Sequence, residues 1–146
     1  MAFSLGVIRD DIEARVNNQI AQPVYRGGVP TAEDLIYTNG QLTPYVVLNF
    51  SDMAPSASRS FIGARGDGYY LMVNFMCVGP TSAIAEAIQS NLIDKMLGYK
   101  PVYSGQMNKT PGGGTFTILD ANDTSVAYVA IASFRVNILA LDITVP

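Results

Sequence analysis

Three acidic side chains, Asp10, Asp11 and Glu13, form the densest group of potential acid–base or metal-binding residues in the sequence. Paired carboxylates of this kind can share a proton or hold a divalent cation. Apolar residues recur at helical spacing over residues 5–20, and the three acids lie off that apolar stripe. They fall in the first half of the predicted helix, where its dipole favours negative charge. We therefore interpret them as an exposed acidic helix face.

Nucleophilic catalysis lacks its usual base, because the sequence contains no histidine. This absence excludes Ser-His-Asp and Cys-His arrangements and the common zinc ligand sets. The single cysteine, Cys77, lies in the run LMVNFMCV, which is typical of a buried strand. A thiol in that position acts as a small apolar side chain, and one cysteine excludes an internal disulfide.

Two loops resemble ligand sites without meeting their requirements. TPGGGTF, residues 110–116, is followed by a predicted strand, and Lys109 precedes its glycines, whereas a phosphate loop ends in Lys-Ser/Thr and leads into a helix. DANDTS, residues 120–125, begins like a calcium loop, but Ser125 stands at its glycine position and Ile131 at the position of its bidentate glutamate. We interpret both as turns, and we predict a protein that is not an enzyme and has no cofactor or metal site.

The tripeptide Arg65-Gly66-Asp67 matches a motif that many cell-surface receptors recognise. It lies within FIGARGDGYY, where glycines alternate with other residues just before a predicted strand that begins at Tyr69. Glycine supplies unusual backbone angles in such a segment, and aspartate supplies local hydrogen bonds. We interpret the tripeptide as the end of a loop and not as a receptor signal.

Length and composition favour one domain over residues 1–146, with an unusually uncharged surface. Charged residues make up 14% of the chain, against about 25% in a typical soluble domain. A partner subunit is the simplest cover for such a surface, and uncharged polar residues are the alternative. The net charge of −3 and the absence of a basic run exclude a nucleic-acid-reading stripe. No apolar run approaches the ~20 residues of a membrane span, and charges in MAFSLGVIRDD argue against a signal peptide, so we expect synthesis in the cytoplasm.

The apolar periodicity predicts an α+β fold, with two amphipathic helices packed on one face of a mostly antiparallel sheet and long projecting loops. Gly98 suits the left-handed position that ends the second helix, and a bend or bulge is expected near Ala132-Ser133 because the last strand is long. The predicted helices cover residues 5–20 and about 81–97, and the predicted strands cover 23–26, 44–52, 69–78, 115–119 and 125–145.

Three long connections, residues 27–43, 53–68 and 100–114, separate these elements. Unstructured loops beyond about 12–15 residues are uncommon in compact domains and are usually functional or disordered. The alternative is that they contain hairpins, for which Asn39-Gly40 is a strong turn signal in the first connection. Charged residues in these connections can pair between subunits and so set their register. The alternative is that each charge is simply solvated. The candidate subunit or tube contacts are Arg59, Arg65, Asp67, Lys100 and Lys109.

Four segments follow one another along the chain: MAFSLGVIRDDIEARV, PYVVLNFSD, GARGDGYYLMV and KTPGGGTF. This order resembles the tail terminator proteins of long-tailed, siphovirus-type actinobacterial bacteriophages and, more distantly, the tail terminator of phage lambda. The resemblance implies a structural virion protein that forms a homohexameric ring at the head-proximal end of the tail. It further implies that the ring caps the tail tube, stops polymerisation of the major tail tube protein and joins the tail to head-completion or neck proteins, with DNA only as passing cargo. Members of that family are not enzymes.

Two other functions are also compatible with the sequence. Another neck component, such as a head-completion or stopper protein, also uses a small α+β domain in a ring. A small-molecule-binding α+β domain is the alternative from a different class, and it predicts a monomer that metabolites stabilise. Particles lacking the protein separate the first two functions, since overlong tubes indicate a terminator and leaking heads indicate a stopper.

Overall fold

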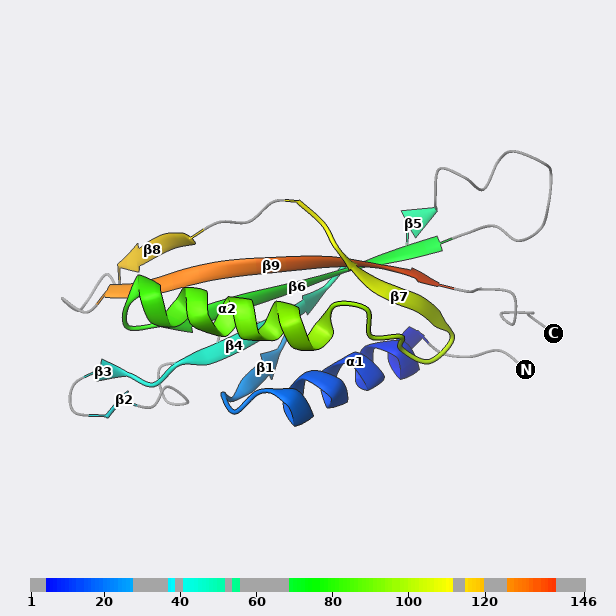
Figure 1. Cartoon of the computed structure of the whole chain (residues 1–146). Coiled ribbons are helices and arrows are strands. Elements are labelled where there is room, and N and C mark those ends of the chain that lie inside the picture. The colour runs from blue at the N-terminus through cyan, green and yellow to red at the C-terminus, as the bar shows by residue number, and fades with distance from the viewer. Residues whose placement is uncertain are drawn as a thin grey trace, which may run out of the picture.

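The computed structural model describes residues 5–27, 37–38, 41–51, 54–55, 69–111, 115–119 and 126–138. Two helices and nine strands lie within these ranges (Figure 1). In chain order they are α1 (Leu5–Gln19), β1 (Val24–Arg26), β2 (Tyr37–Thr38), β3 (Gln41–Leu42), β4 (Tyr45–Phe50), β5 (Ala54–Pro55), β6 (Tyr69–Gly79), α2 (Ser82–Met96), β7 (Ser104–Lys109), β8 (Thr115–Leu119) and β9 (Val126–Ile138).

One large sheet forms the frame, with strand order β1-β4-β6-β9-β7. β5 pairs with the beginning of β6 and β8 with the beginning of β9, while β2 and β3 form a separate two-stranded hairpin. Only the β1–β4 pair is parallel among the described strand pairs. The fold is therefore α+β with a mostly antiparallel sheet, as the sequence predicts.

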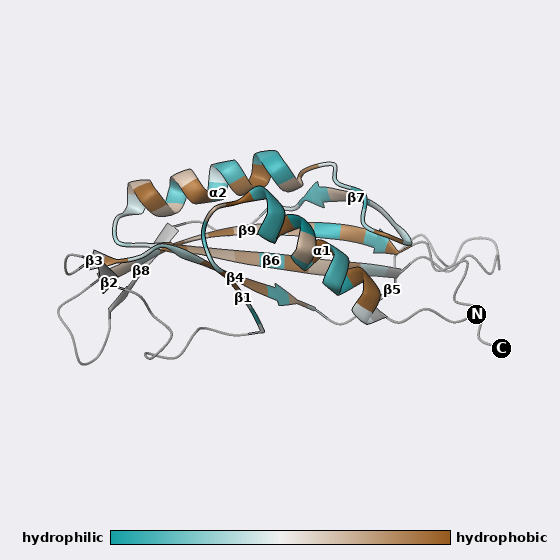
Figure 2. Cartoon of the chain, turned by 90° about the horizontal axis from the view of Figure 1, so that it is seen from below, coloured by the Kyte–Doolittle hydropathy of each residue, from teal (hydrophilic) through white to brown (hydrophobic). Residues whose placement is uncertain are grey.

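Both helices are amphipathic and pack on the same face of this sheet (Figures 1 and 2). In α2, the Thr81 side chain accepts a hydrogen bond from the Ile84 amide at 3.2 Å and so caps the first turn. Gly98 has a φ of 81°, which confirms the predicted left-handed stop of this helix. The four-residue spacing of Ile84, Ile88, Leu92 and Met96 predicts one apolar stripe on α2, but the buried stripe begins at Ala85, and the Ile84 side chain is 37% exposed.

The main core lies between the two helices and the sheet. Phe75 of β6 and Phe134 of β9 are fully buried at its centre, with their rings edge-to-face at 5.7 Å. The remaining buried side chains come from the inward faces of the two helices and from every other position of the central strands, which is the period expected of a sheet with one face against helices. They include Ile8, Ile12, Val16, Val46, Leu48, Leu71, Val73, Ile88, Leu92, Met96 and Val136.

The predicted 100–114 connection is corrected by the structure, because it contains the edge strand β7. The hairpin alternative for the first connection is confirmed by the pairing of Tyr37–Thr38 with Gln41–Leu42. Within the second, Ala54–Pro55 forms the short strand β5. None of the described helices has the length and apolarity needed to cross a membrane.

The sequence predicts a bend or bulge near Ala132-Ser133, and the pairing of β9 with β6 contains no bulge there. Pairing of β9 with β6 runs without a register shift from Ile138 opposite Tyr69 to Tyr128 opposite Gly79. The other edge of β9 changes partner in this region instead, since β8 pairs with residues 126–130 and β7 with residues 134–138. A strand of this length stays regular because β6 is nearly as long and two shorter strands share its other side.

Candidate interaction surfaces

Two of the three acids on α1 neutralise an arginine on the neighbouring strand. The Arg26 guanidinium Nη1 lies 2.6 Å from Asp10 Oδ1 and 3.1 Å from Glu13 Oε1. The hydrogen bond to Asp10 is the main cause of the raised pKa of Arg26, and desolvation opposes it. Arg26 also lies over the Phe50 ring at 5.3 Å. The acids thus fasten α1 to the edge of the sheet, and as exposed pairs they contribute little to stability.

Asp11, the third acid, holds the connection between α2 and β7. Its Oδ1 accepts a hydrogen bond from the Tyr99 hydroxyl at 2.8 Å, and its Oδ2 accepts one from the Val102 amide at 2.7 Å. Both carboxylate oxygens therefore bind groups some ninety residues further along the chain. We call Asp11, Arg15, Tyr99 and Val102 the Asp11 latch.

Arg15 completes the latch one turn along α1. Its guanidinium lies over the Tyr99 ring at 4.7 Å, and its Nη2 donates to the Lys95 carbonyl at 3.2 Å, at the end of α2. Desolvation, followed by the hydrogen bond to Asp11, raises the pKa of Tyr99. On the other side, Met107 of β7 exchanges backbone hydrogen bonds with Gly98 and Tyr99 at 2.9 and 2.8 Å. The connection is therefore fixed by both α1 and β7.

This fixed connection presents apolar side chains to solvent. Leu97, Val102 and Tyr103 are 52%, 37% and 44% exposed. Val7 is 44% exposed and precedes Asp11 by one helical turn, so it lies on the face of α1 that meets the connection. Tyr103 has a φ of 56°, which is unusual for a bulky residue and costs about 1–3 kcal/mol. We call residues 97–103 together with Val7 the connection patch.

The predicted contact residues fall in different environments. Lys100 is exposed within the connection patch. Lys109 is partly buried, and its ammonium donates to the Thr110 carbonyl at 2.6 Å, so the chain itself binds this charge. Arg59, Arg65 and Asp67 lie outside the described residues. Of the predicted contacts, Lys100 is thus the one that the described structure places beside exposed apolar groups.

The sheet face opposite the helices, which we call the helix-free face, is apolar at one end. Rows across β4, β6 and β9 bury Tyr45, Val47, Val78 and Val129 there. Tyr25 of β1 packs edge-to-face on Tyr45 with ring centroids 5.8 Å apart. These residues form a second, smaller core.

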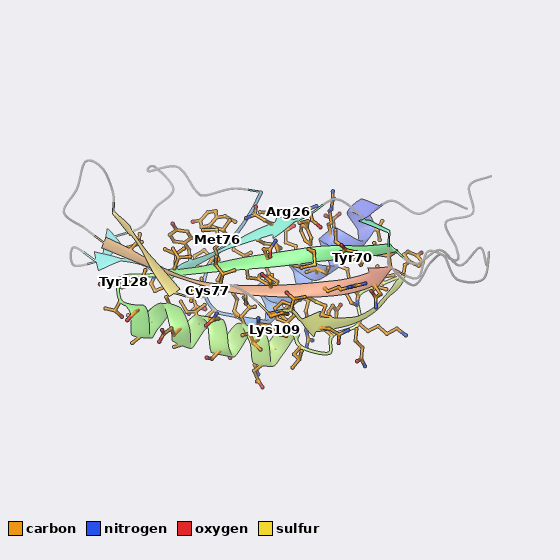
Figure 3. The ribbon with its side chains drawn as sticks, turned by 90° about the horizontal axis from the view of Figure 1, so that it is seen from above. Arg26, Tyr70, Met76, Cys77, Lys109 and Tyr128 are labelled. Carbon is orange, nitrogen blue, oxygen red and sulfur yellow. The ribbon has the colours of Figure 1, made fainter. Side chains whose placement is uncertain are left out.

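The other end of the helix-free face is polar. Asn49, Asn74 and Ser133 lie in one row across the three strands, and the Ser133 hydroxyl donates to Asn74 Oδ1 at 2.7 Å. Arg135 stacks over the Tyr70 ring at 4.1 Å (Figure 3 labels Tyr70 on this end and Met76 on the apolar end). Because Arg135 is stacked on Tyr70, the polar end of the helix-free face presents mainly uncharged hydrogen-bonding groups.

Cys77 lies among the buried side chains of the main core. Burial raises the pKa of the Cys77 thiol to about 12, so the nucleophilic thiolate is suppressed, in keeping with the predicted structural role of this residue. No three His, Cys, Asp or Glu side chains gather at metal-binding distance in the described ranges. The sequence matches no protein-family profile and no curated protein.

Sequence reasoning missed the Asp11 latch entirely. The pairing joins Asp11 to Tyr99 and Val102 across the fold, and no local spacing marks it. The available signal was an acid close to the apolar stripe of α1, since Asp11 directly precedes the buried Ile12.

Proposed function

We propose that the protein is a ring-forming phage tail terminator that caps the head-proximal end of the tail tube and joins it to the neck. The observation that carries this proposal is the joint order of the four segments that resemble this family. Each segment is weak alone, but together they are distributed over residues 1–116 of the chain.

The places of these segments in the fold support the proposal. MAFSLGVIRDDIEARV supplies α1, PYVVLNFSD supplies β4, and the last part of GARGDGYYLMV begins β6. All four segments contribute to the helix-and-sheet frame, and the first also carries the Asp11 latch. The resemblance therefore concerns a shared scaffold, as is expected of a subunit whose role is assembly.

An assembly role is also supported by the connection patch. Exposed apolar side chains on a segment that is fixed from two sides favour docking, because little conformational entropy is lost on binding. Low overall charge points the same way. We keep Arg59, Arg65, Asp67, Lys100 and Lys109 as candidate contacts to neighbouring subunits or to the tube protein.

Electron microscopy of the purified protein tests the proposal most directly. A ring in negative stain, together with a hexamer mass by light scattering, is the expected result. A monodisperse monomer, both alone and with the major tail tube protein, would overturn it.

Particles that lack the protein then separate the terminator from another neck component. Overlong tail tubes are expected, because nothing stops polymerisation of the tube protein. Tails of normal length on heads that leak DNA would identify a stopper or head-completion protein instead.

A further inference from the structure

The exposed large apolar side chains of the described residues gather at two places. Val7, Leu97, Val102 and Tyr103 belong to the connection patch, beyond the C-terminal end of α2. Ile84 lies at the opposite, N-terminal end of the same helix. α2 has fifteen residues, so the two places are about 20 Å apart along its axis.

The two ends differ in charge. At the C-terminal end, the exposed Lys95 and Lys100 outnumber Asp94. At the N-terminal end, Glu86 is exposed and is the one charged residue between Gly79 and Asn91 in the sequence. The connection patch is therefore apolar with a positive border, and the beginning of α2 presents one exposed apolar side chain, Ile84, beside the negative Glu86.

The N-terminal end is also rigid. The Thr81 cap fixes the first turn of α2. Ile84 packs so closely on the backbone of Gly79 that a Cβ there would lie 2.9 Å from Ile84 Cγ2. Both surfaces are thus held in place before any partner arrives, which lowers the entropic cost of binding.

We propose that the connection patch of one copy docks on the N-terminal end of α2 of the next copy, with Lys100 facing Glu86. Complementarity of charge and exposed apolar residues on two different surfaces of one chain selects a second copy as the occupant. A contact between two different surfaces is head-to-tail, and such contacts close into rings when the rotation between copies allows. The inference rests on the proposed ring and names the contact that builds it.

A charge-swap series tests this contact. Lys100→Glu and Glu86→Lys are each expected to weaken self-association about tenfold or more, because like charges then meet across the interface. The double variant restores the opposite pair and is expected to recover the ring. Sedimentation velocity and light scattering over a range of concentrations measure the assembly, and circular dichroism verifies that each variant is folded.

Asn17→Glu and Asn17→Lys are matched controls, because Asn17 is exposed and lies on the face of α1 that carries Asp10 and Glu13, not on the face of Asp11 and Arg15 that meets the connection. They change the net charge in both directions and are expected to leave the ring intact. Single variants that assemble like the wild type, or a double variant that stays dissociated, would overturn the inference.

The outcomes distinguish this inference from the proposed function. If rings form and all variants assemble normally, the terminator proposal stands and the contact is elsewhere. If the Lys100→Glu ring is intact but no longer binds tail tube protein, the connection patch faces the tube, and the copy-to-copy contact is wrong. If the wild type forms no oligomer, both proposals fail.

Discussion

Replacing Asp11 by alanine removes the acceptor for two hydrogen bonds at once. The Tyr99 hydroxyl, 2.8 Å from Asp11 Oδ1, and the Val102 amide, 2.7 Å from Asp11 Oδ2, both lose their acceptor. The Tyr99 hydroxyl lies in a partly buried contact, so its loss is felt most, whereas the exposed Val102 amide can bind water again. We expect the connection between α2 and β7 to loosen from α1.

The magnitude follows from the two bonds. A hydrogen bond contributes about 0.5–1.5 kcal/mol net, and up to about 3 kcal/mol when one partner is charged. With one contact partly buried and one exposed, Asp11→Ala should lower the free energy of unfolding by about 2 kcal/mol. Tyr99→Phe removes one of the two bonds and should cost about half as much.

Urea unfolding followed by far-UV circular dichroism measures these changes, with Asp10→Ala as the matched control. Asp10 is the adjacent acid, and its side chain is 71% exposed in its pair with Arg26, so its removal should cost well under 1 kcal/mol. Hydrogen exchange gives a second readout, since the Val102 amide should exchange faster in Asp11→Ala and not in Asp10→Ala. Equal stability losses in the two variants, with unchanged exchange at Val102, would refute the latch.

Three further predictions concern the core and the contact of α2 with the sheet. Between pH 9 and 12 the Cys77 thiol ionises in the unfolded chain but not in the folded one. The contribution of the buried thiol to the free energy of unfolding is therefore complete below pH 9 and is lost as the pH rises toward 12. In urea unfolding at alkaline pH, the free energy of unfolding of Cys77→Ala should fall less steeply with pH than that of the wild type. Gly79→Ala should cost about 1–3 kcal/mol in urea unfolding, because the new methyl group collides with Ile84. Gln89→Glu should cost about 1–2 kcal/mol in the same assay at pH 7, because it replaces the donor that binds the Ile131 carbonyl at 2.6 Å with an acceptor.

Each of these predictions has its own contrary result. Labelling of the thiol in native protein as fast as in urea would show that Cys77 is not buried. A Gly79→Ala variant as stable as wild type would place the backbone of α2 further from β6 than described. Gln106→Glu is the control for Gln89→Glu, as the same exchange at an exposed position of β7, and equal costs in the two would remove the role of the Ile131 carbonyl.

The main elements were predictable because strong periodicity marks them. Both helices carry apolar residues every three or four positions, and these residues form their buried faces. The apolar run of β6, in which Asn74 is the one amide, correctly predicts a central strand, since β4 pairs on one side of it and β9 on the other. The apolar periodicity of these elements is clear because their buried side chains all pack into the main core.

β7 escaped prediction for a physical reason. Its buried residues, Ser104 and Met107, are three positions apart, because the register with β9 shifts between them. A two-residue alternation is therefore absent, and one of the two buried side chains is polar. The contact surfaces could not be predicted either, since the Asp11 latch joins groups distant in sequence and the exposure of Ile84 depends on which turn of α2 meets the sheet.

The divided edge of β9 has a consequence for how the chain folds. β9 pairs with β6, β7 and β8, all of which precede it in the sequence, and it supplies Phe134 to the centre of the core. Until β9 arrives, the apolar face of β6 and the helix faces remain incompletely covered. Pairing of β6 with β9 joins residues up to 69 positions apart, from Tyr69 to Ile138, so closure of the sheet is a late and slow step. The main core can therefore be completed only after β9, the last described strand, has been made.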